Sequence, residues 1–119
     1  DHPFFGRWPA ITRNQFGSGT LTYEGTALSD GLQQTVVLDV LRESGLTSSD
    51  QDLPGPVRVK HGINRAGKRI HYYLNYSGAS ANFTYAYAAS RDLLTGHAIG
   101  RGSSVSLAPW DLAILEEDK

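Results

Sequence analysis

The chain has 119 residues, with 11 Lys and Arg against 12 Asp and Glu, and it contains no cysteine. This length suffices for one hydrophobic core, or for one core with an attached fragment, but not for two full domains. Balanced charge gives no field that would gather nucleic acid or anionic lipid, and the apolar runs fall short of the ~20 residues of a membrane helix. Without cysteine there is no disulfide, thiolate metal site or thiol nucleophile, and the cellular compartment of the protein is not determined.

The first elements predicted along the chain form a β-hairpin. Residues 10–16 and 20–26 are rich in residues that favour strands. Between them, Phe16-Gly17-Ser18-Gly19 has the glycine content of a tight reversal of the chain. These two segments are therefore expected to pair.

A helix over residues 30–44 is predicted next. Asp30 is the expected N-cap, with Gln33 three residues later completing a capping box, and Gly45 stands where a left-handed residue usually ends a helix. The helical spacing of the apolar residues places five of them on one stripe. These are Leu32, Val36, Val37, Val40 and Leu41.

The polar stretch 47–55 ends in Pro54-Gly55 and has no hydrophobic periodicity, as is typical of a solvated linker. It divides the chain into three predicted regions. Residues 1–46 form a hairpin-plus-helix fragment of an α/β domain, 47–55 the linker, and 56–119 a small antiparallel β domain.

The hydrophobic pattern beyond the linker has a period of two, which predicts a second hairpin. If Ile63 pairs with Lys68, the apolar residues of both strands share one face, with Val59 opposite Tyr72 and Val57 opposite Leu74. The expected apolar residues of the second strand are Ile70, Tyr72, Leu74 and Tyr76. In this register His61 lies on the apolar face, while His71 and Tyr73 lie on the polar face.

Further short strands are expected as far as the C-terminal end. They are Asn82–Tyr87, with Phe83, Tyr85 and Tyr87 on one face, a strand around Leu93 and Leu94, Ser104–Leu107 and Trp110–Leu115. Together these features predict a mostly β chain with one helix, in which a small antiparallel β-sandwich follows the hairpin-plus-helix fragment.

We find no catalytic, cofactor-binding or metal-binding residues in this pattern. The predicted register places His61 and His71 on opposite faces of the hairpin, so they cannot share a metal; His61 is expected in the core and His71 at the surface. Glu116, Glu117 and Asp118 at the chain end are interpreted as a solvated tail. The motifs of serine hydrolases and zinc peptidases do not occur.

The aromatic residues allow one candidate binding function. Most of them fall on predicted core faces, because aromatic side chains are the usual core material of small β domains. Tyr73 is the exception, since the predicted register leaves it on the polar face. It is therefore the candidate sugar contact, on which a galactoside ring would stack.

Two stretches resemble glycoside hydrolase family 42 β-galactosidases. Arg13-Asn14-x-Phe16-Gly17-x-Gly19-x-x-x-Tyr23-x-Gly25-Thr26, followed by a capped helix, is similar to the end of their middle, trimerisation domain. Asp92–Gly96 and Leu107–Glu116 resemble the small β domain that closes these enzymes, although the second pattern also occurs in other glycosidase families.

The resemblance implies a parent protein in three parts: a catalytic (β/α)8 barrel, an α/β domain that assembles trimers, and the β domain. The family hydrolyses terminal β-galactosides with retention, using two carboxylates about 5 to 5.5 Å apart. Those carboxylates belong to a barrel of about 250 residues, which this chain cannot contain. The chain alone is therefore expected to be inactive.

Three functions follow as hypotheses. The first is a non-catalytic C-terminal structural and assembly region of a bacterial β-galactosidase, cytoplasmic or periplasmic, whose partners are the catalytic barrel of the same chain and further copies in a homo-oligomer. The others are a carbohydrate-binding module and a stand-alone interaction domain. Because a helix and hairpin cut from a larger sheet leave apolar faces uncovered, the helix is expected to fold back on its hairpin or to self-associate.

Overall fold

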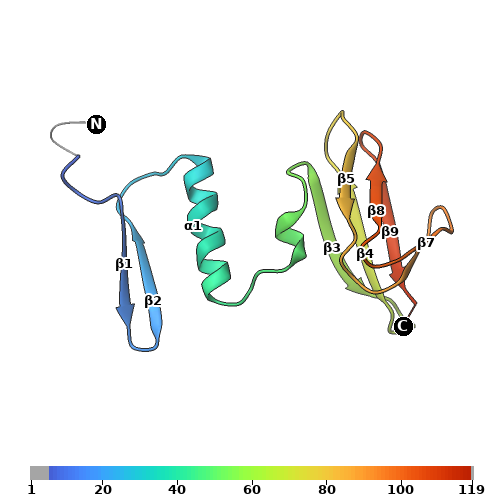
Figure 1. The fold of residues 1–119 in the computed structure, drawn as a ribbon, viewed down its shortest axis with the longest axis horizontal. Coiled ribbons are helices and arrows are strands. Elements are labelled where there is room, and N and C mark those ends of the chain that lie inside the picture. The colour runs from blue at the N-terminus through green and yellow to red at the C-terminus, as the bar shows by residue number, and fades with distance from the viewer. Residues whose placement is uncertain (1–5, 119) are drawn as a thin grey trace. The chain divides into compact units, whose positions relative to one another are not determined.

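The computed structural model describes residues 6–118, and the chain divides into two compact units, residues 1–47 and 48–119 (Figure 1). The predicted class is confirmed: antiparallel strands dominate, and α1 is the one α-helix of the described part. Within that part no helix has the length and apolar character needed to cross a membrane.

The first unit begins with the predicted hairpin. Strands β1 (Ile11–Phe16) and β2 (Gly19–Glu24) pair antiparallel, with Ile11 opposite Glu24. A two-residue loop joins them, and Gly17 has a φ of 60°, a left-handed conformation that glycine adopts without steric strain. The hairpin prediction is therefore confirmed, with slightly shorter strands.

Helix α1 (Asp30–Glu43) follows in the same unit. Its N-cap is Ser29 instead of Asp30, and the predicted capping box is not formed, because no side chain caps this end. The C-terminal end is as predicted, since Gly45 has a φ of 65°. The Leu46 and Gly45 amides donate to the carbonyls of Leu41 and Arg42, which is the Schellman arrangement.

The segment predicted as a free linker, 47–55, mostly belongs to the second unit. It contains the 3-10 helix η1 (Ser49–Asp52), which is closed by a capping box between Ser48 and Gln51. Leu53 then packs against the core. Polar composition suggested a solvated loop, but local capping and one apolar anchor hold the segment in place.

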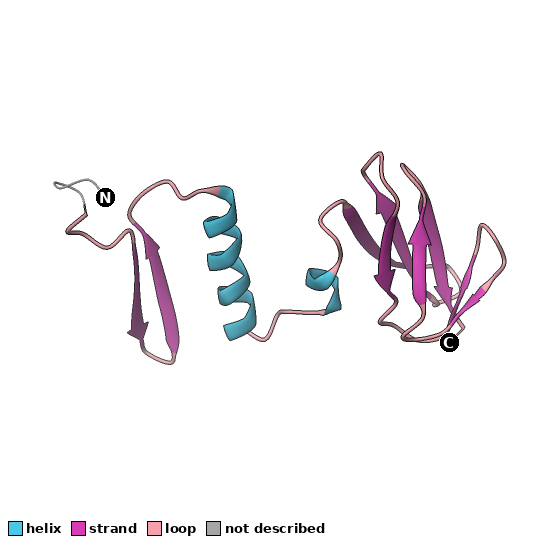
Figure 2. Ribbon diagram, turned by 45° about the horizontal axis from the view of Figure 1, so that its top comes forward, coloured by secondary structure: helices cyan, strands magenta, loops and turns pink. Residues whose placement is uncertain are grey.

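The second unit consists of two antiparallel sheets (Figure 2). The larger sheet has the strand order β3-β4-β9-β6-β7, and the smaller one pairs β5 with β8. The strands are β3 (Val57–Ile63), β4 (Arg69–Asn75), β5 (Ala81–Thr84), β6 (Ser90–Asp92), β7 (Ala98–Ile99), β8 (Ser104–Leu107) and β9 (Leu112–Glu117).

Side chains from both sheets form one hydrophobic core. The core residues are Val57, Tyr73, Ala81, Phe83, Tyr85, Val105, Leu107, Ala113 and Leu115. Phe83 and Tyr85 are buried and Tyr87 packs against them, so the face predicted for these three residues is confirmed. Alternating burial along β8 and β9 shows that each strand turns one face inward.

The predicted register of the β3–β4 hairpin is wrong by one residue. Ile63 lies opposite Arg69, and Val59 lies opposite Tyr73. The turn explains the shift, because the Asn64 side chain accepts hydrogen bonds from the Ala66 and Lys68 amides, and the Asn64 amide donates to the Lys68 carbonyl. Pairing therefore begins at Asn64 and Lys68, with three residues between them.

A shift of one residue exchanges the faces of a strand. The side chains of His71, Tyr73 and Asn75 are consequently buried, whereas Tyr72, which was predicted on the apolar face, is exposed. The polar side chains reach the core because each of them has a hydrogen-bond partner or an aromatic neighbour there.

Two expectations for the last third of the chain are corrected. The residues interpreted as a solvated tail are part of β9 as far as Glu117, which is buried. The strand expected around Leu93 and Leu94 lies earlier, at β6, and these two leucines are exposed in the turn that follows.

Candidate functional site

Two histidines face each other at the centre of the β3–β4 hairpin. His61 lies opposite His71 in the register, and their Nδ1 atoms are 2.7 Å apart. The expectation that they lie on opposite faces, with His61 in the core and His71 at the surface, is wrong: His71 is 2% exposed and His61 is the more exposed of the two. The one-residue shift in register brings them together.

Each histidine also contacts a carboxylate through its other ring nitrogen. The Nε2 atom of His61 is 2.9 Å from Oδ2 of Asp50 in η1, and Nε2 of His71 is 3.0 Å from Oε1 of Glu117 in β9. We call these four residues the histidine–carboxylate cluster. It links three consecutive elements, η1, β3 and β4, to the distant strand β9.

Tyr87 completes the surroundings of the cluster. Its hydroxyl donates to Oδ1 of Asp50 at 2.8 Å, and its ring stacks on His71. Burial alone would raise the pKa of Asp50, but hydrogen bonds from His61 and Tyr87 outweigh it and lower the pKa below the ordinary 3.8. The environment therefore keeps this carboxylate ionised.

A cavity of about 410 Å³ opens beside the cluster, lined by His61, Gly62, Ile63, Arg69, His71 and Tyr87. The ring nitrogens of both histidines and the Tyr87 hydroxyl already have partners within the protein. The cluster therefore ties secondary-structure elements together and presents no free general base. Within residues 6–118, no three His, Asp or Glu side chains gather closely enough to hold a metal ion.

Tyr73, the candidate sugar contact, is a core residue. Its side chain is 2% exposed, and its ring stacks on Phe83 with centroids 4.4 Å apart. Burial, reinforced by the nearby Tyr85, Tyr87 and Asp50, raises the pKa of its hydroxyl. The corrected register removes Tyr73 from the surface, so it cannot provide a stacking face for a sugar.

Trp110, predicted as the first residue of the last strand, lies before β9 and is exposed. Its side chain is 71% exposed, and its backbone φ is 59°, which is uncommon for a bulky residue. The Trp110 amide donates to the Ser77 carbonyl, and the buried amide group of Asn75 donates to the carbonyls of Ala79 and Ala108. Two neighbouring turns thus hold the tryptophan in this conformation, and sequence pattern gives no signal of it.

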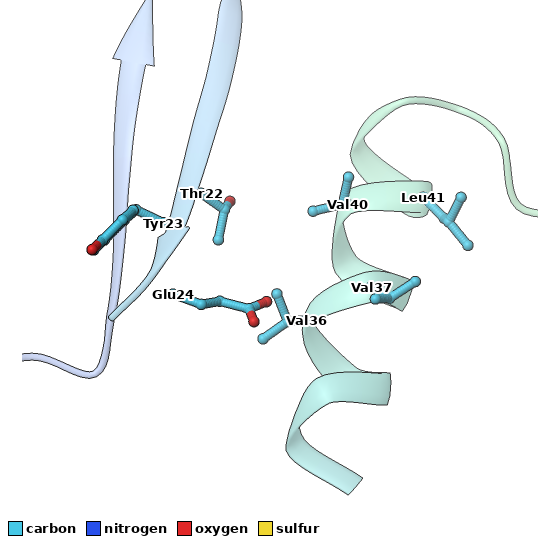
Figure 3. A pocket seen from close by; sticks show the side chains of 7 residues that line it. All are labelled: Thr22, Tyr23, Glu24, Val36, Val37, Val40 and Leu41. Carbon is cyan, nitrogen blue, oxygen red and sulfur yellow. The ribbon is translucent and has the colours of Figure 1, made fainter. Parts of the chain in front are cut away.

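The first unit contains an open apolar groove between β2 and α1 (Figure 3). It has a volume of about 400 Å³ and is lined by Thr22, Tyr23, Glu24, Val36, Val37, Val40 and Leu41. Polar contacts bridge its two sides: Gln33 donates to Glu24 at 3.0 Å, and Arg13 pairs with Glu43. Thr22 and Glu24 project from the strand toward Val36 and Val40 on the helix (Figure 3).

The groove is not closed by these contacts. No residue of α1 is buried, and Val37 and Val40 remain 47% and 40% exposed. The helix therefore faces its own hairpin, but the apolar stripe stays largely uncovered.

Comparison with known proteins gives relatives of one kind. No family model matches the chain. The β-galactosidase LacA of Lactobacillus acidophilus is 27% identical over 94% of this chain. The crystal structure of a β-galactosidase from Bacillus circulans sp. alkalophilus superposes with a TM-score of 0.77, at 25% identity over 92% of this chain. A catalytic mutant of a GH42 β-galactosidase from G. stearothermophilus has a TM-score of 0.78 over 98% of the chain at 20% identity, which shows a common fold.

In each of these cases the match is to a small part of a larger protein. The chain spans 16% of the length of LacA and 16% of each of the two solved structures. Both the sequence match and the structural matches extend over more than nine-tenths of this chain.

Proposed function

We infer that this chain is a structural and assembly region of a glycoside hydrolase family 42 β-galactosidase. The inference is supported by a relationship to the C-terminal portion of such enzymes in sequence and in fold. In this proposal the chain carries no catalytic residue. Its partners are the rest of a parent chain and further copies of that parent in a homo-oligomer, for which a trimer is our specific proposal.

The exposed apolar stripe of α1 is the observation that carries the proposal. Full burial of a valine or leucine side chain contributes roughly 1.5 to 3 kcal/mol. Val37 and Val40 are about half exposed, so the isolated unit leaves much of this stabilisation unused. Relatives about six times longer than the matched portion offer the additional surface that would cover such a stripe.

The chemistry of the parent is also part of the proposal. We propose that it hydrolyses terminal β-galactosides with retention, as a step of carbohydrate metabolism, using two carboxylates in its own barrel. The histidine–carboxylate cluster supports a structural interpretation of this portion, because its acid and base groups are engaged with one another.

Paired substitutions on α1 in the complete gene product test the assembly role. Val37→Asp places a charge in the stripe, whereas Gln34→Asp adds the same charge at an exposed polar position on the same helix. We expect Val37→Asp to reduce the oligomer mass measured by light scattering, and Gln34→Asp to leave it unchanged. Both proteins are also assayed with p-nitrophenyl β-galactoside.

Equal oligomer mass and equal activity of the two variants would contradict an assembly role for this helix. Hydrolysis of p-nitrophenyl β-galactoside by the 119-residue chain itself would contradict the non-catalytic assignment.

Trp110 favours a second candidate, a carbohydrate-binding role for the β domain. Its indole ring is exposed, and the backbone that carries the ring is held by the hydrogen bond from the Trp110 amide to the Ser77 carbonyl. An exposed aromatic ring is suited to stacking on a sugar face. The test is a proton–nitrogen NMR titration of the chain with galactose, lactose and a galacto-oligosaccharide. Saturable shifts around Trp110 that vanish in Trp110→Ala are expected from this role, and an absence of shifts at all three sugars would exclude it.

A further inference from the structure

Three hydrogen bonds run in a row through the histidine–carboxylate cluster. Asp50 contacts His61 at 2.9 Å, His61 contacts His71 at 2.7 Å, and His71 contacts Glu117 at 3.0 Å. Each of these contacts requires one hydrogen between its two heavy atoms. The row therefore needs three protons.

Asp50, whose pKa is lowered, only accepts hydrogen bonds, and when Glu117 accepts as well the three protons lie on the two imidazole rings. Two neutral rings carry only two protons in total. One ring is consequently an imidazolium that donates from both nitrogens, while the other ring donates from Nε2 and accepts at Nδ1. The negative charges of Asp50 and Glu117 at the two ends stabilise this excess proton.

Other proton counts do not fit the short contact between the rings. With two ring protons that both point to the carboxylates, two nitrogen lone pairs would face each other at 2.7 Å. If one of the two lies between the rings instead, one Nε2 lone pair would face its carboxylate. With four, two N–H groups would point at each other and the rings would carry like charges. Each of these arrangements leaves at least one repulsive contact, so only three ring protons supply a hydrogen to all three contacts.

The surroundings contain few other charges. The Tyr87 hydroxyl contacts Asp50, and its pKa is raised by burial and by Asp50, so it remains a neutral donor. The Tyr85 ring lies beside His71, and burial together with Glu117 raises its pKa as well. Arg69 lines the adjacent cavity. These groups add no second acceptor that could replace the proton between the rings.

We propose that His61 and His71 form a specific binding site for one excess proton, and that this proton acts as a latch that fastens η1 to the sheet. Loss of the proton would leave one of the three contacts without its hydrogen and so weaken the row of hydrogen bonds that connects η1 to the sheet. Residues 48–53 come directly after the last residue of the first unit, so the latch controls how firmly the connection between the units is anchored. The inference does not depend on the proposed function.

The proton count can be measured directly on the 119-residue chain. Nitrogen chemical shifts of the imidazole rings distinguish a doubly protonated ring from each neutral tautomer. In the folded chain we expect three ring protons on His61 and His71 together, with the Nδ1 nuclei coupled through the shared hydrogen. Two neutral rings in a chain with intact η1 would overturn the proposal.

Amide hydrogen exchange tests the latch itself. The exchange rates of the amides in residues 48–53 are measured as the pH is raised until the excess proton leaves, and they are corrected for intrinsic rates. We expect these rates to increase roughly tenfold or more, because one charged hydrogen bond is lost. Amides of β4 and β9 serve as internal references. Unchanged protection of 48–53 after proton loss would also overturn the proposal.

Two variants complete the design. Asp50→Asn keeps the shape of the side chain but removes one of the charges that hold the proton, so proton loss and acceleration of exchange should both move to lower pH. His97→Gln removes an exposed histidine outside the cluster and should leave both midpoints unchanged. If Asp50→Asn and His97→Gln behave alike, the carboxylate does not stabilise the proton and the latch is refuted.

Discussion

Tyr87 stacks on His71, with ring centroids 4.3 Å apart and planes inclined by 19°, while its hydroxyl donates to Asp50 at 2.8 Å. The Tyr87 side chain thus contacts both the buried His71 and Asp50, the carboxylate at the other end of the histidine–carboxylate cluster. The contact explains how η1 is held on the sheet even though no residue of that helix is buried.

Replacing Tyr87 by phenylalanine separates these two contacts. Tyr87→Phe keeps the stacked ring but removes the hydrogen bond to Asp50, and we expect a loss of about 1 kcal/mol in the free energy of unfolding. The measurement is urea unfolding followed by circular dichroism. Tyr76→Phe, at an exposed position, is the control and should change stability by less than about 0.5 kcal/mol.

Acid should weaken the second unit through Asp50. Because its folded pKa is lowered below 3.8, its contribution to stability is fully present above pH 3.8 and is lost as the pH falls through the lowered value. Unfolding free energies measured across this range should fall more gently in Asp50→Asn than in the unmodified chain. Asp52→Asn, at an exposed position of the same helix, should reproduce the unmodified slope; if it matches Asp50→Asn, the interpretation fails.

Alkali should destabilise the second unit through the buried Tyr85 and the partly buried Tyr87. Burial raises the pKa of Tyr85, and Glu117 adds to the effect; burial and Asp50 do the same for Tyr87. Their stabilising contribution is complete below pH 10.0 and is lost as the pH rises through the raised values. We expect the ultraviolet absorbance of tyrosinate from these residues to appear together with unfolding. Their ionisation while the circular dichroism of the fold persists would contradict this.

Glu117 is predicted to contribute much more to the free energy of unfolding than the neighbouring Asp118. Glu117→Gln removes the charge that faces the buried His71, and we expect a loss of about 2 kcal/mol in the free energy of unfolding. Asp118→Asn is the matched control, because Asp118 is exposed, and it should have almost no effect. Similar urea midpoints for the two variants would show that the buried contact contributes nothing.

Trp110 offers a test of strain. Asparagine tolerates the left-handed conformation better than tryptophan does, so Trp110→Asn should stabilise the chain by about 1 kcal/mol, whereas Trp110→Phe should not. Urea unfolding of the three proteins gives the comparison.

A stabilised Trp110→Asn that no longer shows sugar-induced NMR shifts would combine a gain in stability with a loss of function, as expected for a strained binding residue. A destabilised Trp110→Asn would show that the indole contributes more by packing than it costs in strain.

Local patterns were sufficient to predict most elements of the chain. The first hairpin, the end of α1 at Gly45 and the inward face of Phe83 and Tyr85 follow from turn chemistry and short-range periodicity, and the structure agrees with them. Such features depend on residues close together in the sequence. The resemblance to β-galactosidases was also visible in the sequence, from the Arg13–Thr26 pattern.

The candidate site could not be predicted in the same way. Its geometry depends on the one-residue shift that Asn64 imposes on the β3–β4 hairpin, and that shift exchanges the faces on which His71 and Tyr73 lie. The hydrophobic pattern alone did not distinguish the observed register of this hairpin from the predicted one, because each of the two registers buries some apolar residues.

Composition and local periodicity were enough to establish the fold class of the chain, the order of its elements and the absence of thiol chemistry. The meeting of Asp50, His61, His71 and Glu117, in contrast, depends on how the strands are paired in the folded chain. Their positions are separated by ten residues or more, and hydrogen bonds between such groups form only when sheet register and strand order bring them within about 3 Å.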